Sequence, residues 1–311
     1  MRKLKFSVII ANYNGEKFLK DCLSSVFKTR YRYFEVIALD DGSLDSSVEI
    51  INGFRKRHPI IFIKNRKNLG LVASRNKAIP RASGDILVFL DNDTQVHPEW
   101  LKGFAKIFLK DERVGAAQCK IFDFEKRNII QEVGMKIIPY TGWGITIGRG
   151  EKDYGQFKEP LEIVSLGAAL AVRKEVAKLV NGFDEKLVHY TDDLDFSWRV
   201  WISGFRVVLS PKSYVYHHTK EHDPSYRLYF HLCKNSLRMI LKNYELPNTI
   251  KFLFYSLLIN IMGTVFVLVR RFTVFALGGV ILGIFWNVIF IYDTLKERKK
   301  VSGYRKVKDN F

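Results

Sequence analysis

Two aspartates one residue apart, Asp91 and Asp93, have the type and spacing to bind a divalent cation. They follow an apolar run at residues 86–90, and Asn92 lies between them. Such a run is typical of a buried strand in a parallel sheet, whose ligands gather at the carboxyl ends of the strands. Oxygen ligands placed there would bind Mg²⁺ or Mn²⁺ and, through the cation, a diphosphate. The alternative is an Asx turn that caps the next helix.

Polar residues also follow two earlier apolar runs. Residues 6–11 lead into Asn12 and Asn14, and residues 34–39 lead into Asp40 and Asp41. Apolar residues at helical spacing separate these runs, so strands and helices alternate along the chain. This alternation predicts an α/β fold with a mostly parallel central sheet, flanked by helices and joined by right-handed crossovers. The three strand ends would then lie at one edge of the sheet and form one site.

Composition and motifs exclude several classes of protein. The 311 residues are 47% hydrophobic, enough for a packed core, and three scattered cysteines form no disulfide framework or zinc site. Neither G-x-G-x-x-G nor a Walker loop follows the first strand, which disfavours dehydrogenases and P-loop enzymes. The net charge of +18 calls for an anionic partner. Without an RNA- or DNA-binding motif, nucleic acid is the least favoured, and we expect none.

Four segments resemble the nucleotide-sugar-binding half of the family 2 glycosyltransferases, which have the GT-A fold. They are residues 8–15, residues 39–43, Asn68-Leu69-Gly70 with Arg75-Asn76, and residues 91–93. The resemblance covers roughly residues 5–235 and leaves a rhamnosyltransferase-like subgroup open.

The resemblance implies roles for the residues that bind the donor nucleotide. Asp41 would accept a hydrogen bond from a uracil or thymine imide, and Asp40 would hold the ribose or its own loop. Arg75 would bind the nucleotide or diphosphate. Asn12, Asn14 and Asn92 would line the same pocket. The structural alternatives are a turn-forming Asp40 and an exposed helical Arg75.

The second half of the predicted domain would supply the acceptor side. By the resemblance, Gly167 and Ala168, in the small-residue segment 165–173, would lie against the sugar and acceptor; tight core packing is the alternative. Asp193 would be the general base. Asp192 is the second candidate for that role and would lie beside the acceptor. The local pattern favours Asp192 as a helix cap and an ion pair between Asp195 and Arg199.

A histidine would complete the metal site. His217 and His218 follow a predicted strand at residues 213–216, and a neutral imidazole there can join the carboxylates as a ligand. The resemblance favours a histidine at this place. We prefer His217, although the sequence alone cannot set the phase of the strand.

Three other segments have less specific patterns. Residues 114–118 and 121–122 read as strands near the sheet edge. The glycine-rich residues 140–153 fit either a mobile loop over the site or a hairpin. The helix at residues 226–244 carries several basic residues, which suit a solvated face or the surroundings of an acceptor phosphate.

The predicted domains are a catalytic unit at residues 1–235, with halves at 1–113 and 114–235, and a helical region at 236–311. Two stretches in the latter, Phe252–Val269 and Phe272–Tyr292, lack charge and are long enough to span hydrocarbon. We expect the stripes of small and polar residues on these stretches to face each other: Ser256, Asn260 and Thr264 on the first, and Gly279, Gly283 and Asn287 on the second.

The connection between these stretches carries Arg270 and Arg271, which disfavours a full hairpin across the membrane. An interfacial or shallowly re-entrant pair, anchored by the basic tail from Lys296 to Lys308, avoids the conflict. The alternative is a soluble homodimer that buries both helices. Oligomeric state stays open.

The sequence therefore predicts a metal-dependent, inverting glycosyltransferase at the cytoplasmic face of the cell membrane. It would move a sugar from a UDP- or dTDP-sugar donor to a glycan or lipid-linked acceptor hydroxyl. One alternative is a sugar-phosphate nucleotidyltransferase, although the basic glycine-rich loop of that class does not follow the first strand. The other is a non-catalytic membrane-bound scaffold with a degenerate site.

Overall fold

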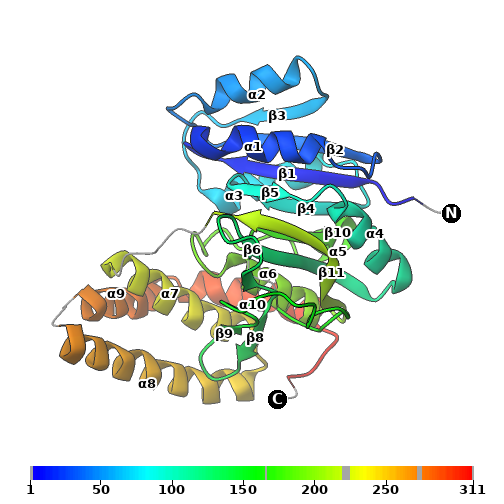
Figure 1. Ribbon diagram of the computed structural model, residues 1–311. Coiled ribbons are helices and arrows are strands. Elements are labelled where there is room, and N and C mark those ends of the chain that lie inside the picture. Colours follow the sequence, from blue (N-terminus) through cyan, green and yellow to red (C-terminus); the bar gives the residue numbers. More distant parts are fainter. Residues whose placement is uncertain (1–2, 165–166, 219–224, 272–274, 310–311) are drawn as a thin grey trace.

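A computed structural model describes residues 3–164, 167–218, 225–271 and 275–309. Ser165 and Leu166, part of the predicted small-residue segment, lie outside this range. The central sheet has the strand order β3-β2-β1-β4-β10-β6-β11-β5, with β7 paired to β6 (Figure 1). The strands are β1 Phe6–Asn12, β2 Phe34–Asp40, β3 Ile60–Lys64, β4 Ile86–Asp91, β5 Thr94–Val96, β6 Val114–Asp123, β7 Ile130–Glu132, β10 Ala169–Arg173 and β11 Arg206–His217.

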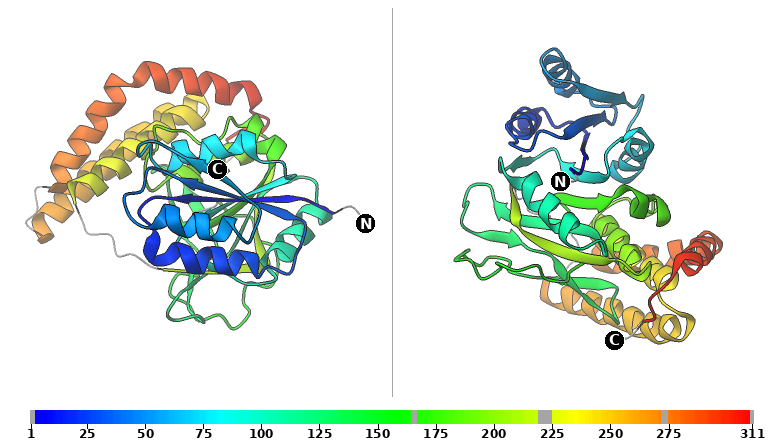
Figure 2. Two further views of the ribbon diagram at one scale, coloured as in Figure 1. Left: turned by 90° about the horizontal axis from the view of Figure 1, so that it is seen from above. Right: turned by 90° about the vertical axis from the view of Figure 1, so that its right-hand side faces the viewer.

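The first four long strands pair in parallel, as the alternation of strands and helices predicted. Helices α1 (Glu16–Phe27), α2 (Ser47–Arg55) and α4 (Trp100–Lys110) pack on the face that holds Val8 and Ile10. Helices α3 (Leu71–Ala78), α5 (Lys174–Leu179) and α6 (Asp192–Ile202) pack on the face of Ile9. Figure 2 shows helices on both sides of the sheet. Because both faces are covered, β1 is buried along its whole length, and the predicted α/β fold class is confirmed.

The prediction that residues 114–118 and 121–122 lie near the sheet edge is wrong, because they belong to β6, which lies inside the sheet. Strand β10 inserts antiparallel between β4 and β6, and β11 pairs with the other side of β6. Both neighbours come from later in the chain, so the local pattern could not reveal them. Residues 213–216, expected as a strand, form the last part of one longer strand, β11, which has an irregular register between Ser210 and Tyr214.

Of the two alternatives for the glycine-rich segment, a mobile loop or a hairpin, the structure shows the hairpin. Strands β8 (Met135–Ile138) and β9 (Trp143–Thr146) pair antiparallel. Gly142, at a φ of 67°, sits at the turn. A Cβ there would lie 3.1 Å from the Ser236 carbonyl oxygen, so the turn packs against the helix of residue 236.

That helix, α7 (Tyr226–Asn243), contains the expected domain boundary at residue 235. It lies in a helical layer with α8 (Leu246–Arg271), α9 (Phe275–Ile289) and α10 (Ile291–Tyr304). In Figure 1, α7, α8 and α9 are at the lower left and α10 is nearer the centre. The prediction of a solvated basic face is wrong for Lys234 and Arg238, which are both buried. Lys234 donates to the Lys186 carbonyl and Arg238 donates to Asp184, so both side chains contact the loop that precedes α6.

The stripe of small residues on α9 packs against α7, and not against α8 as predicted. A Cβ on Gly279 would lie 2.5 Å from the Tyr226 carbonyl oxygen, and Asn287 donates to the Lys234 carbonyl. Glycine therefore allows α9 to approach the backbone of α7 closely. Ser256, Asn260 and Thr264 of α8 are buried as well. The side chains of Arg270 and Arg271 lie outside the described part of the structure.

The lengths and compositions of the helices bear on whether they could span a membrane. Among the described residues, no single helix combines the necessary length with the necessary apolar character. Helices Ala276–Ile289 and Ile291–Tyr304, bent by 69° at their junction, meet both conditions only as a pair.

Candidate functional site

The carboxyl ends of β1, β2 and β4 form one polar edge, which we call the strand rim. Register pairs Asn12 with Asp40, and Ala11 with Asp91. The Asn12 amide bridges the rim, because it donates to Asp40 at 3.1 Å and accepts from Asn92 at 2.6 Å. The predicted convergence of the three strand ends is therefore present.

Asp40 holds the turn that follows β2. Its carboxylate is fully buried and accepts hydrogen bonds from Asn12 and from the amide and hydroxyl of Ser43. Asn14 has a φ of 47°, and its side chain accepts from the Leu44 amide. These contacts fix the two loops at the rim, as the turn-forming alternative for Asp40 describes.

Asp41 holds the loop before α3. Its Oδ1 accepts from the Asn65 amide group at 2.8 Å and from the Leu69 amide at 2.9 Å, and its Oδ2 accepts from the Gly70 amide at 2.9 Å. A carboxylate offers about four acceptor positions, so these three bonds leave capacity for a further donor. Its role as a ligand of the base stays a prediction.

Arg75 lies at the centre of the site. It projects from α3, is only 2% exposed, and contacts three carboxylates from two distant parts of the chain. Nη2 lies 2.7 Å from Asp91, while Nη1 lies 3.1 Å from Asp192 and 3.0 Å from Asp193. The alternative of an exposed helical arginine is wrong. The guanidinium joins the end of β4 to the start of α6, and its role as a nucleotide or diphosphate ligand stays a prediction.

Asp192 and Asp193 are buried in the first turn of α6. Asp192 was predicted to cap this helix, but the N-cap is Thr191 and no side chain caps it. The Asp192 carboxylate turns to Arg75 instead. Burial raises the pKa of both aspartates, and repulsion from neighbouring carboxylates adds to this rise, whereas Arg75 opposes it. Asp193 thus becomes a stronger base than a solvated aspartate.

Asp91, Asp93 and His217 form the one three-residue cluster with metal-ligand geometry among the described residues. One candidate ligand atom from each lies within 4.8 Å of the others. His217 Nε2 is 3.3 Å from Asp93 Oδ1. Two carboxylates and an imidazole suit Mn²⁺ or Mg²⁺. The residues therefore fit the cation that the sequence predicted.

His218 has a different environment. Its ring lies against Phe18, with centroids 4.5 Å apart, and stacks on Phe124, with centroids 3.6 Å apart. Its backbone amide donates to the Asp93 carbonyl. The geometry thus favours His217 as the ligand, and His218 as a residue that packs the loops together.

The start of β10 lies beside these carboxylates. The backbone amide of Gly167 bonds to the Asp193 carboxylate, and the Ala168 carbonyl accepts from the Asp91 amide at 2.9 Å. Both residues have a positive φ, 59° and 47°. A Cβ on Gly167 would lie 3.5 Å from Asp193 Oδ2, in van der Waals contact with it. Their contact with a sugar or acceptor stays a prediction.

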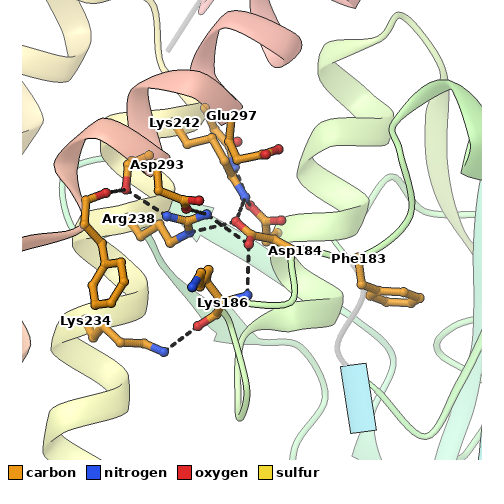
Figure 3. Close-up of polar contacts among 12 residues, drawn as sticks. Phe183, Asp184, Lys186, Lys234, Arg238, Lys242, Asp293 and Glu297 are labelled. Atoms are coloured by element: carbon orange, nitrogen blue, oxygen red, sulfur yellow. Dashed lines mark hydrogen bonds and ion pairs between the residues drawn. The ribbon is translucent and has the colours of Figure 1, made fainter. Parts of the chain in front are cut away.

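A second charged cluster lies apart from the rim, around Asp184 (Figure 3). Asp184 accepts from Arg238 at 2.8 Å and from Lys242 at 2.6 Å, and these two cations hold its pKa well below the usual range against the opposing effect of burial. Arg238 also reaches Asp293 of α10 at 2.9 Å. A cavity of about 540 Å³ opens here, and Asn76, Lys178 and Glu185 are among its lining residues.

Asp195 belongs to this second cluster. The predicted ion pair with Arg199 is confirmed at 2.8 Å, and Lys242 lies 2.9 Å from the same carboxylate. All three side chains are buried. This cluster ties α6 to α7.

Two residues near the site carried no sequence signal. Gln131 on β7 bonds to His217, and Glu132 is buried beside Gln118, which donates to it at 3.0 Å. Burial raises the pKa of Glu132 to about 8. Neither residue belongs to a recognisable motif, and β7 is only three residues long.

Comparison with known proteins agrees with this geometry. The family model described as "Glycosyl transferase family 2" matches residues 7–177. Poly-beta-1,6-N-acetyl-D-glucosamine synthase of Staphylococcus epidermidis is 26% identical over 207 residues, which are 67% of this chain and 48% of that protein. The chain thus spans about half the length of the curated relatives it matches.

Solved structures share the fold. S. aureus TarS 1-349 in complex with UDP superposes with a TM-score of 0.63 at 21% identity, covering 97% of this chain and 90% of that one. The mannosyltransferase PcManGT from Pyrobaculum calidifontis, in complex with GDP-Man and Mn²⁺, gives a TM-score of 0.59 at 14% identity, covering 97% and 86%. At these identities the likeness establishes the fold alone.

Proposed function

The chain belongs to glycosyl transferase family 2, and we propose that it transfers a sugar from a nucleoside diphosphate donor to an acceptor hydroxyl. One observation carries the proposal: Arg75 links the candidate metal cluster to the buried aspartate pair at the start of α6. The cluster consists of Asp91, Asp93 and His217, and Arg75 contacts both Asp91 and Asp193. Neither the nucleotidyltransferase nor the scaffold alternative gains a specific observation.

In this proposal Asp193 is the general base. Its carboxylate accepts the proton of the acceptor hydroxyl as that oxygen attacks the anomeric carbon. The bond from the anomeric carbon to the diphosphate oxygen breaks, and its electron pair leaves with the nucleoside diphosphate. Single displacement inverts the anomeric configuration. Arg75 holds Asp193 Oδ1 at 3.0 Å and so fixes the direction of the base.

Asp91, Asp93 and His217 would hold Mn²⁺ or Mg²⁺. When bound, the cation would offset negative charge on the departing diphosphate. Asp41 and the rim asparagines would bind the nucleotide, and a UDP- or dTDP-sugar fits the acceptor capacity that Asp41 retains toward an imide N–H. Asp192, Gly167 and Ala168 would border the acceptor.

Nucleotide release from UDP- and dTDP-sugars in the presence of a membrane lipid extract tests the proposal. We expect Asp193→Asn to reduce transfer by about 10²- to 10⁴-fold, the usual contribution of a general base. Stabilisation by nucleotide and Mn²⁺ in a thermal shift assay should persist. Asp21→Asn, an exposed change on α1, is the matched control. Undiminished transfer by the Asp193 variant would remove this residue from its role.

We also propose that the enzyme works at a membrane surface, because α8 has a reversed distribution of polarity. Its buried face carries Ser256, Asn260 and Thr264. Its outer face exposes Ile250, Phe254 and Met262, by 66%, 66% and 61%. A water-soluble helix buries its apolar face, so this arrangement suits a helix whose outer side meets hydrocarbon.

Helices α9 and α10 repeat this pattern and add charge. On α9, Gly279 and Gly283 face inward, while Phe285 and Val288 are 59% and 63% exposed. On α10, Tyr292 is 82% exposed, and exposed Lys296, Lys299 and Lys300 follow it. Apolar side chains beside an aromatic residue and lysines suit helices that lie in the plane of an anionic leaflet. This favours the cytoplasmic face and an acceptor that is lipid-linked or part of a cell-envelope glycan.

Flotation with vesicles of phosphatidylcholine, with and without 30% phosphatidylserine, tests the membrane surface. The protein should float with the anionic vesicles, and Phe254→Asp combined with Phe285→Asp should reduce the bound fraction at least tenfold. Leu109→Asp, an exposed apolar position on α4, should not. A stable dimer in sedimentation, together with no flotation, would contradict the proposal and favour burial of these helices between two copies.

A further inference from the structure

His217 is held at two points by one glutamine. Gln131 Nε2 donates to the His217 backbone carbonyl at 2.8 Å, and Gln131 Oε1 lies 2.9 Å from His217 Nδ1. Gln131 lies on β7 between Ile130 and Glu132, which pair with Phe122 and Ile121 of β6. The register is irregular at this point, and it is the two contacts with His217 that place the Gln131 side chain beside the metal cluster.

These two contacts determine which tautomer the neutral imidazole ring adopts. A backbone carbonyl can only accept, so the NH₂ group of Gln131 must face it. The amide oxygen then faces Nδ1, and because an amide oxygen also only accepts, Nδ1 must carry the hydrogen. In the neutral ring, Nε2 is left with its lone pair.

That lone pair points at an anion. Nε2 is 3.3 Å from Asp93 Oδ1, and one ligand atom of Asp91 lies within 4.8 Å of both. Two acceptors at that separation repel each other unless a proton or a metal cation lies between them. In the neutral ring, the side chain of Gln131 thus imposes the tautomer whose Nε2 lone pair can ligate a cation.

We propose that Gln131 is a positioning residue that holds the His217 ring in the tautomer and orientation that present Nε2 to a divalent cation. The inference rests on the proposed metal site and adds to it a residue that does not touch the metal. Such partners of a ligating histidine fix the ring and raise its affinity for metal.

Direct binding of Mn²⁺, followed by the loss of the free-ion signal in electron paramagnetic resonance, tests the inference. We expect Gln131→Met to weaken Mn²⁺ binding 10- to 100-fold. Gln131→Glu retains an acceptor for the Nδ1 hydrogen and should stay within a few-fold of wild type. Gln156→Met is the matched control, because the Gln156 amide bonds within residues 151–156 instead.

A second measurement reports the tautomer itself in the metal-free protein. Nitrogen-15 spectra of histidine-labelled protein, with His217 assigned by its loss in His217→Asn, should show a protonated Nδ1 in wild type and a mixture of tautomers in Gln131→Met. Equal Mn²⁺ affinity and an unchanged tautomer in that variant would overturn the inference. Wild-type protein that binds no Mn²⁺ would instead contradict the metal site of the proposed function.

Discussion

Helix α6 contributes aspartates to two clusters of carboxylates, and these clusters differ in charge balance. Around Asp184, three aspartates meet three cations, namely Arg199, Arg238 and Lys242. Figure 3 shows Asp184 with Arg238, Lys242 and Asp293. At the strand rim, Asp91, Asp192 and Asp193 share Arg75, and Asp93 adds a fourth carboxylate. The first cluster is electrically neutral, whereas the second has an excess of negative charge.

The pKa values of the aspartates follow this difference. Buried Asp184 and Asp195 have lowered pKa values, because the adjacent cations outweigh the effect of burial. Buried Asp192 and Asp193 have raised pKa values, because one guanidinium does not outweigh burial and mutual repulsion. Burial alone therefore does not distinguish a structural aspartate from a chemical one. A cluster with an excess of negative charge is stabilised when it binds a cation or a proton, and the strand rim is such a cluster.

The largest effect is expected from Arg75→Met, which removes the one cation shared by three rim carboxylates. Loss of one partner from a buried ion pair leaves uncompensated charge, so we expect a loss of about 4–5 kcal/mol in urea unfolding. Adding Asp192→Asn to the same chain should restore part of it. Arg81→Met, an exposed change, is the control. A loss below about 1 kcal/mol would mean that the rim carboxylates do not depend on Arg75.

Asp184→Asn tests the balanced cluster, and we expect it to lower the free energy of unfolding by about 3 kcal/mol. The change leaves Arg238 and Lys242 buried with an excess of positive charge. Asp293→Asn should cost less than about 1 kcal/mol, because Arg238 keeps its pair with Asp184 and the Asp293 side chain is 39% exposed. Similar losses for both variants would contradict the assignment of Asp184 as the centre of the cluster.

Glu132→Gln should stabilise the protein at pH 8 and not at pH 4. The folded pKa is about 8, above the ordinary glutamate value, so the folded state binds the proton more tightly than the unfolded chain does. Stability is therefore lost as pH rises from roughly 4.5 toward 8, and glutamine removes that loss. We expect a gain of about 2 kcal/mol at pH 8 in EDTA, measured by thermal unfolding across this range. A gain that does not depend on pH would rule out ionisation as the cause.

A small effect is expected from Asp192→Asn. It relieves repulsion within the rim and should raise stability by about 1 kcal/mol at pH 8 without metal, opposite in sign to Asp184→Asn. Circular dichroism melts of the two variants in EDTA compare them directly. Destabilisation by Asp192→Asn would show that the rim is balanced after all.

The sequence predicted the elements of the rim because each of its signals is local. An apolar run that stops at Asp91, or at Asp40, shows where a buried strand ends, and alternation with helices places those ends together. The resemblance then pointed to Asp193 and to a histidine near residue 217. The fold class is confirmed on the same grounds.

What the sequence could not predict are the partners across the fold. Arg75 meets Asp192 and Asp193 across more than a hundred residues, and nothing in its helix indicates burial. The stripe of small residues on α9 indicated a close contact with another helix, but residue spacing does not identify α7 as that helix. Gln131 contacts His217 across 86 residues by geometry alone.

The position of Arg75 also means that the two halves of the sheet cannot be separated without harm. A fragment that ends at residue 113 would keep the guanidinium but lose two of its three counter-ions. The complementary fragment would keep Asp192 and Asp193 without their cation. Because Arg75 and these aspartates also belong to the proposed catalytic site, we expect variants with altered sugar donors or acceptors to tolerate changes in the surrounding loops better than changes at these positions.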